Sequence, residues 1–131
     1  MLFRSKKGAA AASQQRAKHF IALAEQEESY RRVKEAMTHY TKATECDPPE
    51  GLAWYKIAQI LRNHEDDNRG ALNNLRKAVA KEPRNVSFRI ALAEVYLAEK
   101  LAANAQREFM TVLEIDPKND TAKGMLKQLK R

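Results

Sequence analysis

Apolar and small residues recur along this chain with the spacing of one helical face. Positions i, i+3, i+4 and i+7 of three stretches align as Phe20, Leu23, Ala24 and Glu27, then Trp54, Ile57, Ala58 and Leu61, then Arg89, Leu92, Ala93 and Tyr96. A second helical row follows each stretch: Ala36, Tyr40 and Ala43; Ala71, Leu75 and Ala78; Ala105, Phe109 and Val112. The pattern predicts three helical hairpins in tandem.

The prolines repeat with the same period as these rows. Pro48, Pro83 and Pro117 stand in matching settings, separated by 35 and then 34 residues. A recurrence of this length indicates stacked units, each made of one pair of helices.

The alanine spacings place one irregularity in the middle unit. Ala24, Ala58 and Ala93 are separated by 34 and then 35 residues, whereas Ala36, Ala71 and Ala105 are separated by 35 and then 34. One extra residue therefore lies between Ala58 and Ala71. We expect it in the polar stretch 62–70, the turn of the middle hairpin, because loops absorb insertions at little cost.

The middle unit resembles the tetratricopeptide repeat pattern W-x₂-L-G-x₂-Y…A-x₃-F…P. It matches at Trp54, Ile57, Ala58, Leu61, Ala71, Leu75 and Pro83, and the third unit matches at Leu92, Ala93, Tyr96, Ala105, Phe109 and Pro117. The resemblance implies an all-α fold, a right-handed α-solenoid of three helical hairpins closed by a C-terminal capping helix.

The expected organisation follows from this resemblance. The chain divides into a basic N-terminal segment (1–16), three repeats (17–50, 51–85 and 86–119) and a capping helix (120–131) whose apolar side carries Ala122, Met125, Leu126 and Leu129. Asn85, and Asn119 or Asp120, are predicted helix N-caps. The alanine columns mark close helix contacts, where a larger side chain would cost about 1–3 kcal/mol.

Three features depart from the family pattern. Glu27 stands where an aromatic residue or leucine is usual, and we expect it to be tolerated because a terminal helix is half exposed. Arg89 takes the place that Trp54 holds in its unit, and we expect its methylenes to lie on the neighbouring helix with the guanidinium in water. The glycine of the intra-hairpin turn is absent from all three units, so we expect turns that avoid left-handed geometry.

The net charge of +7 comes mostly from the two ends, since residues 1–16 carry four cations and no acid and residues 120–131 carry four cations and one acid. Solubility and solvation of the cap are sufficient reasons for these charges. The single cysteine, Cys46, excludes an internal disulfide. Neither an apolar run of about 18 residues nor the apolar stretch of a secretory signal is present. We therefore expect a cytoplasmic protein with no transmembrane segment.

No constellation of residues indicates catalysis, so we expect no enzyme, no cofactor and no metal site. The histidines His19, His39 and His64 lack HExxH spacing, and one cysteine cannot build a cysteine-based zinc site. The acidic stretch 64–68 lacks the alternating ligands of a calcium loop and is interpreted as a solvated turn. The cysteine and the single tryptophan are interpreted as packing residues.

The resemblance further implies a concave groove lined by the first helix of every hairpin. The expected partner-binding residues are one row past the core stripe, Ile21, Glu25, Glu28, Tyr55, Gln59, Arg62, Ile90, Glu94 and Leu97, with Lys18, Leu52 and Asn63 at the rim. Within each helix the row has i, i+4, i+7 spacing and shares one side. The expected function is a non-enzymatic protein–protein interaction module or adaptor that binds a peptide segment of a partner.

An apolar line within this row is the expected anchor for the peptide: Ile21, Tyr55, Ile90 and Leu97. Burying four such side chains contributes about 6–12 kcal/mol, against association costs of about 4–15 kcal/mol, which favours a micromolar ligand. The alternative is that the N-terminal segment folds back and covers part of the line.

The charges of the row bear on the partner. One subclass of the family clamps the C-terminal carboxylate of chaperone tails with lysine, arginine and asparagine. Here Glu25, Glu28 and Glu94 outnumber Lys18 and Arg62, so such a carboxylate is not the expected ligand. We expect a protein or peptide segment with apolar side chains and one or two cations.

Two other roles stay open. Exposed hairpin edges could stack end to end into a homo-oligomer, either a dimer or a filament scaffold. More weakly, the basic tails together with Leu2 and Phe3 could bind an acidic lipid or nucleic-acid surface, in a salt-dependent manner. A nucleic-acid partner is not expected.

Overall fold

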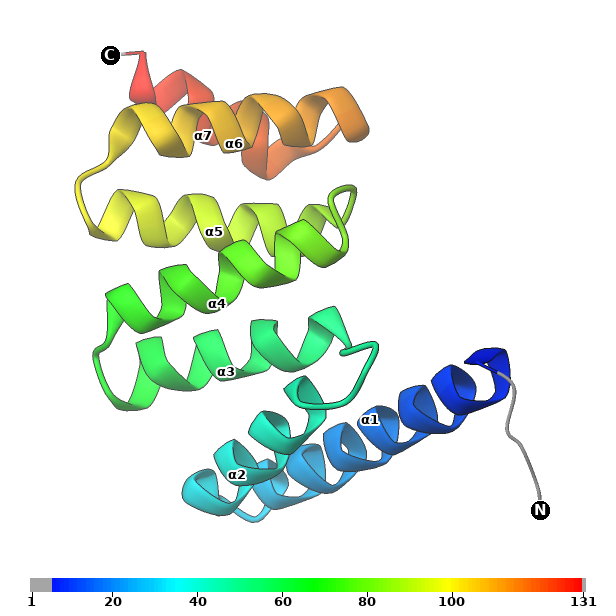
Figure 1. Ribbon diagram of the computed structural model, residues 1–131. Helices are drawn as coiled ribbons and strands as arrows, with labels where there is room; N and C mark the ends of the chain where they lie inside the picture. Colours follow the sequence, from blue (N-terminus) through cyan, green and yellow to red (C-terminus); the bar gives the residue numbers. More distant parts are fainter. Residues whose placement is uncertain (1–5, 131) are drawn as a thin grey trace, which may run out of the picture.

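The computed structural model describes residues 6–130, which form seven α-helices and no strand. The helices are α1 (Lys6–Ser29), α2 (Val33–Thr44), α3 (Gly51–His64), α4 (Asn68–Lys81), α5 (Val86–Ala98), α6 (Ala102–Ile115) and α7 (Asp120–Leu129). Consecutive helices pack in antiparallel pairs, α1 on α2, α3 on α4 and α5 on α6, and α7 covers α6 (Figure 1). The predicted all-α solenoid of helical hairpins is confirmed.

Two columns of alanine run through the stack. Ala24, Ala58 and Ala93 on the first helices and Ala36, Ala71 and Ala105 on the second helices are at most 2% exposed. Because a methyl group is the largest side chain that such close contacts accept without overpacking, these columns set the spacing of the helices.

Larger side chains fill the space beside the alanines in two clusters. Tyr40, Leu75 and Phe109 hold matching places on α2, α4 and α6 and are at most 2% exposed. One cluster joins α1, α2 and α3, and the other extends from α3 to α7. Leu52 and Leu61, both on α3, pack against both clusters.

Each hairpin turn contains one non-glycine residue with left-handed geometry. Arg31, Asp66 and Lys100 have φ angles of 60°, 52° and 62°. The prediction that these turns avoid left-handed geometry is therefore wrong. The conformation brings the next amide back onto the first helix, where Leu101 N–H donates to the carbonyl of Tyr96 at 2.8 Å. This hydrogen bond offsets part of a strain of about 1–2 kcal/mol per turn.

The inserted residue of the middle unit lengthens a helix, not a turn. Every hairpin has three residues between its helices: 30–32, 65–67 and 99–101. Asp67 N–H donates to the carbonyl of Leu61, six residues back, at 2.9 Å. The equivalent bond of the third hairpin reaches only five residues back, from Leu101 to Tyr96. The extra residue thus lies in the last turn of α3, which corrects the expectation of a longer turn.

Arg89 is half-buried and forms an ion pair. Its Nη1 lies 2.9 and 3.0 Å from the two carboxylate oxygens of Glu108 on α6, and its Nε donates to the carbonyl of Pro83 at 2.7 Å. The side chains of Arg89 and Glu108 are 17% and 13% exposed. The expectation that this guanidinium stays in water is wrong, because a carboxylate neutralises it inside the hairpin.

Glu27 is held in a similar way. Its carboxylate pairs with Nδ1 of His39 on α2, and the two side chains are 16% and 26% exposed. Phe20 stacks on the imidazole with ring centroids 6.2 Å apart. The ion pair with His39 on the second helix, and not exposure to solvent, therefore accommodates Glu27. His39 and Glu108 hold matching positions on α2 and α6. The same position of the repeat thus provides the partner of Glu27 in the first unit and the partner of Arg89 in the third.

The described part of the predicted N-terminal segment continues the first helix. α1 runs without interruption for 24 residues, and its N-terminal half extends past α2 (Figure 1). Residues 6–16 therefore do not fold back over the first helices. Leu2, Phe3 and the rest of residues 1–5 lie outside the described residues, as does residue 131. The repeat boundaries stay a prediction.

Asparagine caps begin two helices as predicted. The side-chain oxygen of Asn85 accepts the amide hydrogen of Phe88 at 3.0 Å, and that of Asn119 accepts the amide hydrogen of Ala122 at 2.9 Å. Each bond satisfies a donor that the first helical turn leaves free.

The left-handed turns predict a stabilising glycine substitution. Lys100→Gly should raise the free energy of unfolding by about 1 kcal/mol, because glycine adopts a positive φ without steric cost. Glu99→Gly is the control, since Glu99 has a φ of −90°. It should lower stability by about 0.5–1 kcal/mol. Urea unfolding followed by circular dichroism measures both changes, and equal shifts of the two variants would contradict the argument.

Candidate functional site

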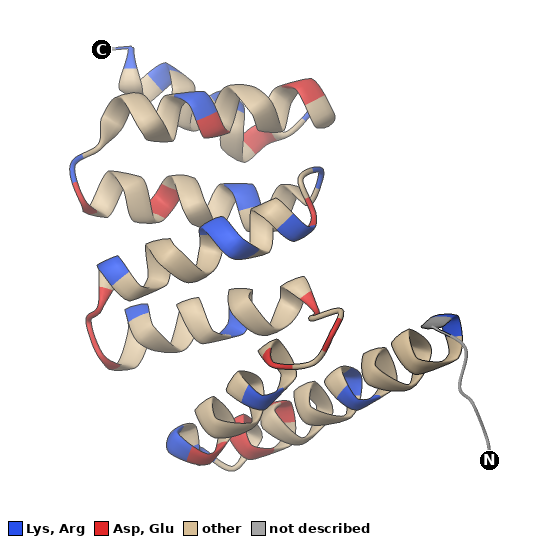
Figure 2. Ribbon diagram, in the orientation of Figure 1, with Lys and Arg blue, Asp and Glu red and all other residues tan. Residues whose placement is uncertain are grey.

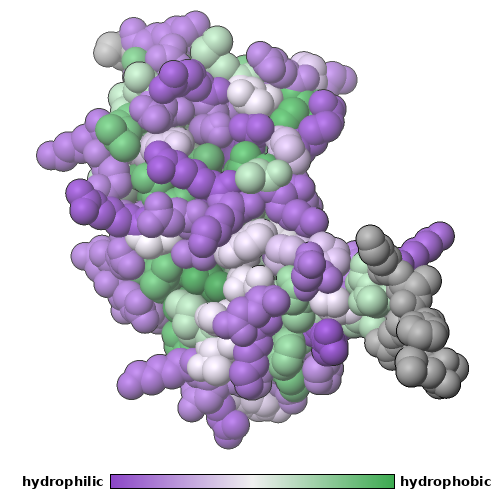
Figure 3. Space-filling view, in the orientation of Figure 1, coloured by the Kyte–Doolittle hydropathy of each residue, from purple (hydrophilic) through white to green (hydrophobic). Residues whose placement is uncertain are grey.

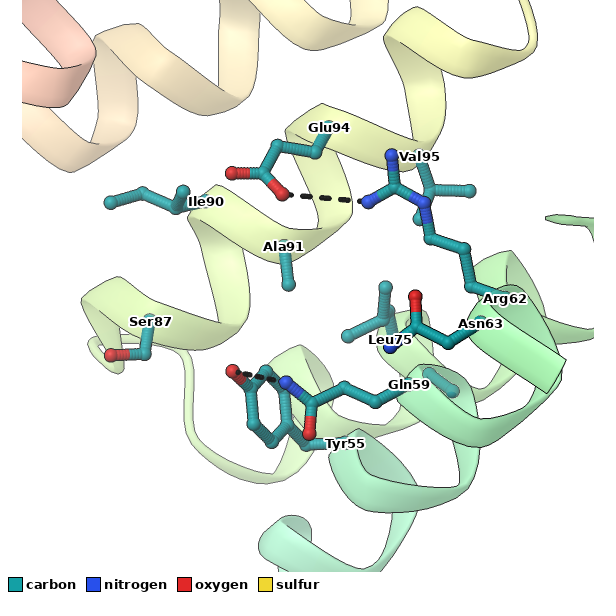
Figure 4. Close-up of a pocket in the computed structure, with 11 residues that line it drawn as sticks. Tyr55, Gln59, Arg62, Asn63, Leu75, Ser87, Ile90, Ala91, Glu94 and Val95 are labelled. Carbon is teal, nitrogen blue, oxygen red and sulfur yellow. Dashed lines mark hydrogen bonds and ion pairs between the residues drawn. The ribbon is translucent and has the colours of Figure 1, made fainter.

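A pocket of about 340 Å³ opens between α3 and α5 (Figure 4). It is lined by Tyr55, Ala58, Gln59, Arg62 and Asn63 from α3, by Ser87, Ile90, Ala91, Glu94 and Val95 from α5, and by Leu75 from α4. The predicted groove residues among them are Tyr55, Gln59, Arg62, Asn63, Ile90 and Glu94. The structure thus brings together half of the twelve predicted groove residues, five from the row and Asn63 from the rim, on two of the three first helices.

The floor of the pocket is apolar and was missed by the row prediction. Ala58, Leu75 and Val95 are at most 2% exposed. Leu75 reaches the pocket from the second helix because Ala58 and Ala91 are too small to cover it. The alanine column of the sequence already marked Ala58 as a position of close helix contact. The spacing along the first helices could not indicate Leu75, because Leu75 lies on a second helix.

Tyr55 is held in place on the wall of the pocket. Its ring stacks on that of Phe88 with centroids 5.0 Å apart and an interplanar angle of 28°. Gln59 Nε2 donates a hydrogen bond to its hydroxyl oxygen at 3.0 Å, which leaves the phenolic proton free to be donated to a ligand carbonyl. Because these contacts order the ring and the hydroxyl of Tyr55 before a ligand binds, this side chain loses little conformational freedom on binding.

An ion pair joins α3 and α5 at the edge of the pocket. Arg62 Nη1 lies 3.4 Å from Glu94 Oε2, and the side chains are 36% and 48% exposed (Figure 4). An exposed pair at this distance contributes only about 0–1 kcal/mol. A ligand can therefore replace either partner, a carboxylate binding Arg62 or a cation binding Glu94.

The first hairpin contributes less to a groove than predicted. Ile21 is 6% exposed and belongs to the cluster that also contains Ala53 and Ile57 of α3. The expectation that Ile21 faces a ligand is wrong, because α3 packs over it. The apolar line is therefore limited to the middle and third units.

Glu28 is bound by a side chain of its own hairpin. The hydroxyl of the buried Tyr40 donates a hydrogen bond to its carboxylate. Burial, followed by the hydrogen bond to Glu28 and then by the charges of Glu28 and Glu25, raises the pKa of Tyr40 above its ordinary value. The phenol therefore keeps its proton and stays a donor. Glu28 is thereby engaged in the fold.

The other predicted groove residues lie outside the pocket. Lys18 and Glu25 are exposed on α1, whereas Leu52 and Leu97 are half-buried and pack against the core. None of the four lines the pocket between α3 and α5.

Residues 6–130 hold no cluster of three or more histidine, cysteine, aspartate or glutamate side chains arranged to bind a metal ion. Over the same range, no helix has both the length and the apolar character needed to span a membrane. Cys46 is half-buried, with its thiol 3.6 Å from the carbonyl oxygen of Lys42. Trp54 is half-buried and packs against the larger core cluster, in agreement with the packing role predicted for it.

Comparison with known proteins identifies one family. The family model described as tetratricopeptide repeat matches residues 63–129, about half of the chain. No curated protein sequence matches.

Several solved structures share the fold. The first tetratricopeptide repeat domain of Spaghetti (RPAP3), bound to the HSP90 peptide SRMEEVD, aligns with a TM-score of 0.78 at 20% identity, over 89% of this chain and 92% of that one. The N-terminal domain of stress-induced protein-1 from C. elegans aligns with a TM-score of 0.78 at 18% identity, over 92% and 98%. The second such domain of human RPAP3, in complex with the HSP70 peptide SGPTIEEVD, aligns with a TM-score of 0.75 at 16% identity, over 93% and 98%.

The hydrogen bond between Tyr40 and Glu28 predicts a pH-dependent contribution to stability. Tyr40→Phe should lower the free energy of unfolding by about 1–2 kcal/mol at pH 7, because the carboxylate loses its donor. Since the pKa of Tyr40 is raised in the folded state, its contribution is complete below about pH 10, the ordinary tyrosine pKa, and is lost progressively at higher pH.

Urea unfolding at a series of pH values measures this effect. Wild type should lose more stability than Tyr40→Phe between about pH 9 and 11. Tyr30→Phe is the control, because Tyr30 is 66% exposed. Identical pH slopes for wild type and Tyr40→Phe would refute the role given to this phenol.

Proposed function

Because this chain belongs to the tetratricopeptide repeat family, we propose that it is a protein-binding module whose pocket between α3 and α5 receives an apolar side chain of a partner segment. The observation that carries the proposal is the pocket itself. An apolar floor of Ala58, Leu75 and Val95 lies open beneath a wall formed by Tyr55 and Ile90. The half-buried side chains of Tyr55 and Ile90 still contact water, and covering them is the main source of binding free energy available on this face.

The size of the pocket favours a peptide segment. Its volume of about 340 Å³ is at the small end of the range of about 300–1,000 Å³ for ligand pockets. It has room for one or two side chains of an otherwise exposed segment. The polar groups of Tyr55, Ser87 and Asn63 stand around it and can bind the peptide backbone.

The charges favour a partner segment with a cation near its apolar anchor. Glu94 lies at the edge of the pocket and is 48% exposed, so its carboxylate is accessible to a lysine or arginine. The peptides bound by the two RPAP3 domains end in the acidic sequence EEVD. In this chain the carboxylate of Glu94 lies beside Arg62, and its repulsion of a second carboxylate disfavours an acidic tail at the same place.

Because Ile21 is buried in the core and cannot contact a ligand, the affinity expected of the site is lower. Only Tyr55 and Ile90 of the apolar line remain at the pocket, and both are half-buried. Completing their burial contributes less than the roughly 3–6 kcal/mol of two fully exposed side chains. Set against the cost of association, this supports dissociation constants in the micromolar range or weaker. The module we propose acts by reversible binding and not by catalysis.

Selection of phage-displayed peptides on the intact chain tests the proposed pocket. Selected peptides should carry an aromatic or aliphatic residue with lysine or arginine nearby, and bind with a Kd of roughly 10 µM or weaker by calorimetry. Ile90→Asp should weaken binding by more than about tenfold, because it places a charge against the apolar floor.

Leu101→Asp is the matched control, since Leu101 lies in the turn before α6, does not line the pocket and is 41% exposed. It should leave binding unchanged. The proposal is wrong if Ile90→Asp binds as wild type does. It is also wrong if the peptide SRMEEVD binds more tightly than every selected peptide and loses this binding in Ile90→Asp.

The ion pair predicts a change of specificity. Glu94→Gln frees Arg62, and so should raise affinity for the peptide SRMEEVD by about threefold while weakening lysine-bearing peptides by a similar factor. Arg62→Gln should shift both affinities in the opposite direction. Fluorescence anisotropy with labelled peptides measures the two ratios, and parallel changes for both peptide classes would show that the pair does not select charge.

A further inference from the structure

Helix α4 carries only basic charges. Four cations and no acid occur between Asn68 and Lys81 (Figure 2). Arg69, Arg76, Lys77 and Lys81 are all exposed, and with Asn73 and Ala80 they form a stripe along the outer side of the helix. We call these six residues the α4 stripe. Figure 3 shows hydrophilic residues crossing the middle of the molecule over this helix.

The fold does not neutralise these charges. The ion pairs among residues 6–130 join His39 to Glu27, Arg62 to Glu94 and Arg89 to Glu108, and none involves α4. Arg69 occupies the second position of the helix, where the helix dipole disfavours a cation. The dipole favours only Lys81, which lies in the last turn, so stability of the helix does not account for Arg69 and Arg76.

Arg76, at the centre of the stripe, is ordered in advance. Its Nε donates to the hydroxyl of Tyr96 at 3.2 Å, and its guanidinium carbon lies 5.7 Å from the centroid of that ring. The terminal nitrogens have no bond to a carboxylate and remain available for a bidentate contact. An arginine fixed by an aromatic ring loses less freedom on binding than a free one.

The second helix of the next repeat, α6, carries one exposed apolar residue and one cation at matching positions. Met110 and Arg107 on α6 hold the repeat positions of Arg76 and Asn73 on α4. Both are exposed, and Met110 is 51% exposed. The outer side of the second helices therefore combines positive charge with an exposed apolar side chain.

Acidic residues limit the length of any ligand on this surface. The turn 65–67 before α4 contains three acids, and Glu82 follows its last residue. Glu45, which directly follows α2, and Glu114 on α6 hold the repeat position of Ala80. From Arg69 to Lys81 the stripe spans about 18 Å at 1.5 Å per helical residue. A long polyanion such as a nucleic acid, or a flat anionic membrane, would meet these carboxylates at the borders.

We infer that the α4 stripe is a second docking surface, separate from the pocket, for a short acidic segment of a partner protein that also carries an apolar side chain. Carboxylates of the segment bind Arg69, Arg76 and Lys77, and its apolar residue contacts Met110. This surface lies on the second helices, so both sites can be occupied at once.

Fluorescence anisotropy with a labelled acidic peptide tests the inference. The probe is a peptide of glutamates and leucines in helical spacing, about 12 residues long, which matches the stripe at 1.5 Å per residue. Arg76→Gln/Lys77→Gln should weaken its binding at least about fivefold, since two charge-assisted contacts are lost. Arg69→Gln/Lys77→Gln should weaken binding by the same factor. Because this variant keeps the contact between Arg76 and Tyr96, it still tests the inference if Arg76→Gln/Lys77→Gln does not fold.

Lys123→Gln/Lys127→Gln on α7 is the matched control, because it removes the same charge from exposed positions. Binding should persist in this control and in Ile90→Asp, and should weaken with added salt. If the α7 control lost as much affinity as the stripe variants, the effect would come from net charge alone, and the inference would be overturned. Tighter, stripe-dependent binding of a thymidine oligonucleotide or of phosphatidylserine vesicles would overturn it as well.

Discussion

Close contact between helices at alanine is the constraint on which this structure depends. The two alanine columns let each helix approach its neighbours, and the larger residues beside them, such as Tyr40 and Phe109, then fill a continuous core. Any larger side chain in a column would push two helices apart and shift every later unit of the stack. The geometry of the inner and outer surfaces follows from this spacing.

The pocket is a product of the same constraint. Ala58 and Ala91 are small enough for Leu75 of α4 to reach the bottom of the pocket, and so the floor includes a second-helix residue between two first helices. The polar groups stand around this opening and not in it. Binding on this face thus combines one apolar opening with charges that are weakly tied to each other, an arrangement suited to reversible association.

Features that depend on local periodicity could be predicted from the sequence, and features that depend on the reach of side chains could not. The hairpins, the alanine columns and the asparagine caps follow from spacing alone. Arg89 was expected in water because its partner Glu108 lies on the following helix. Ile21 and Ile90 hold the same repeat position, yet only Ile21 is buried, because α3 packs on it in a way that no single repeat reveals. The left-handed turns escaped prediction because the stabilising hydrogen bonds belong to the backbone.

The division of the core into two clusters that meet on α3 has a consequence for how the molecule opens. Leu52 and Leu61 connect the clusters, and all the apolar residues of the pocket belong to the cluster from α3 to α7. In repeat proteins stability is a sum of units and of interfaces between neighbours, so terminal units fray before central ones. Local opening of α1 and α2 would therefore expose the N-terminal half to proteases while the ligand pocket remained assembled.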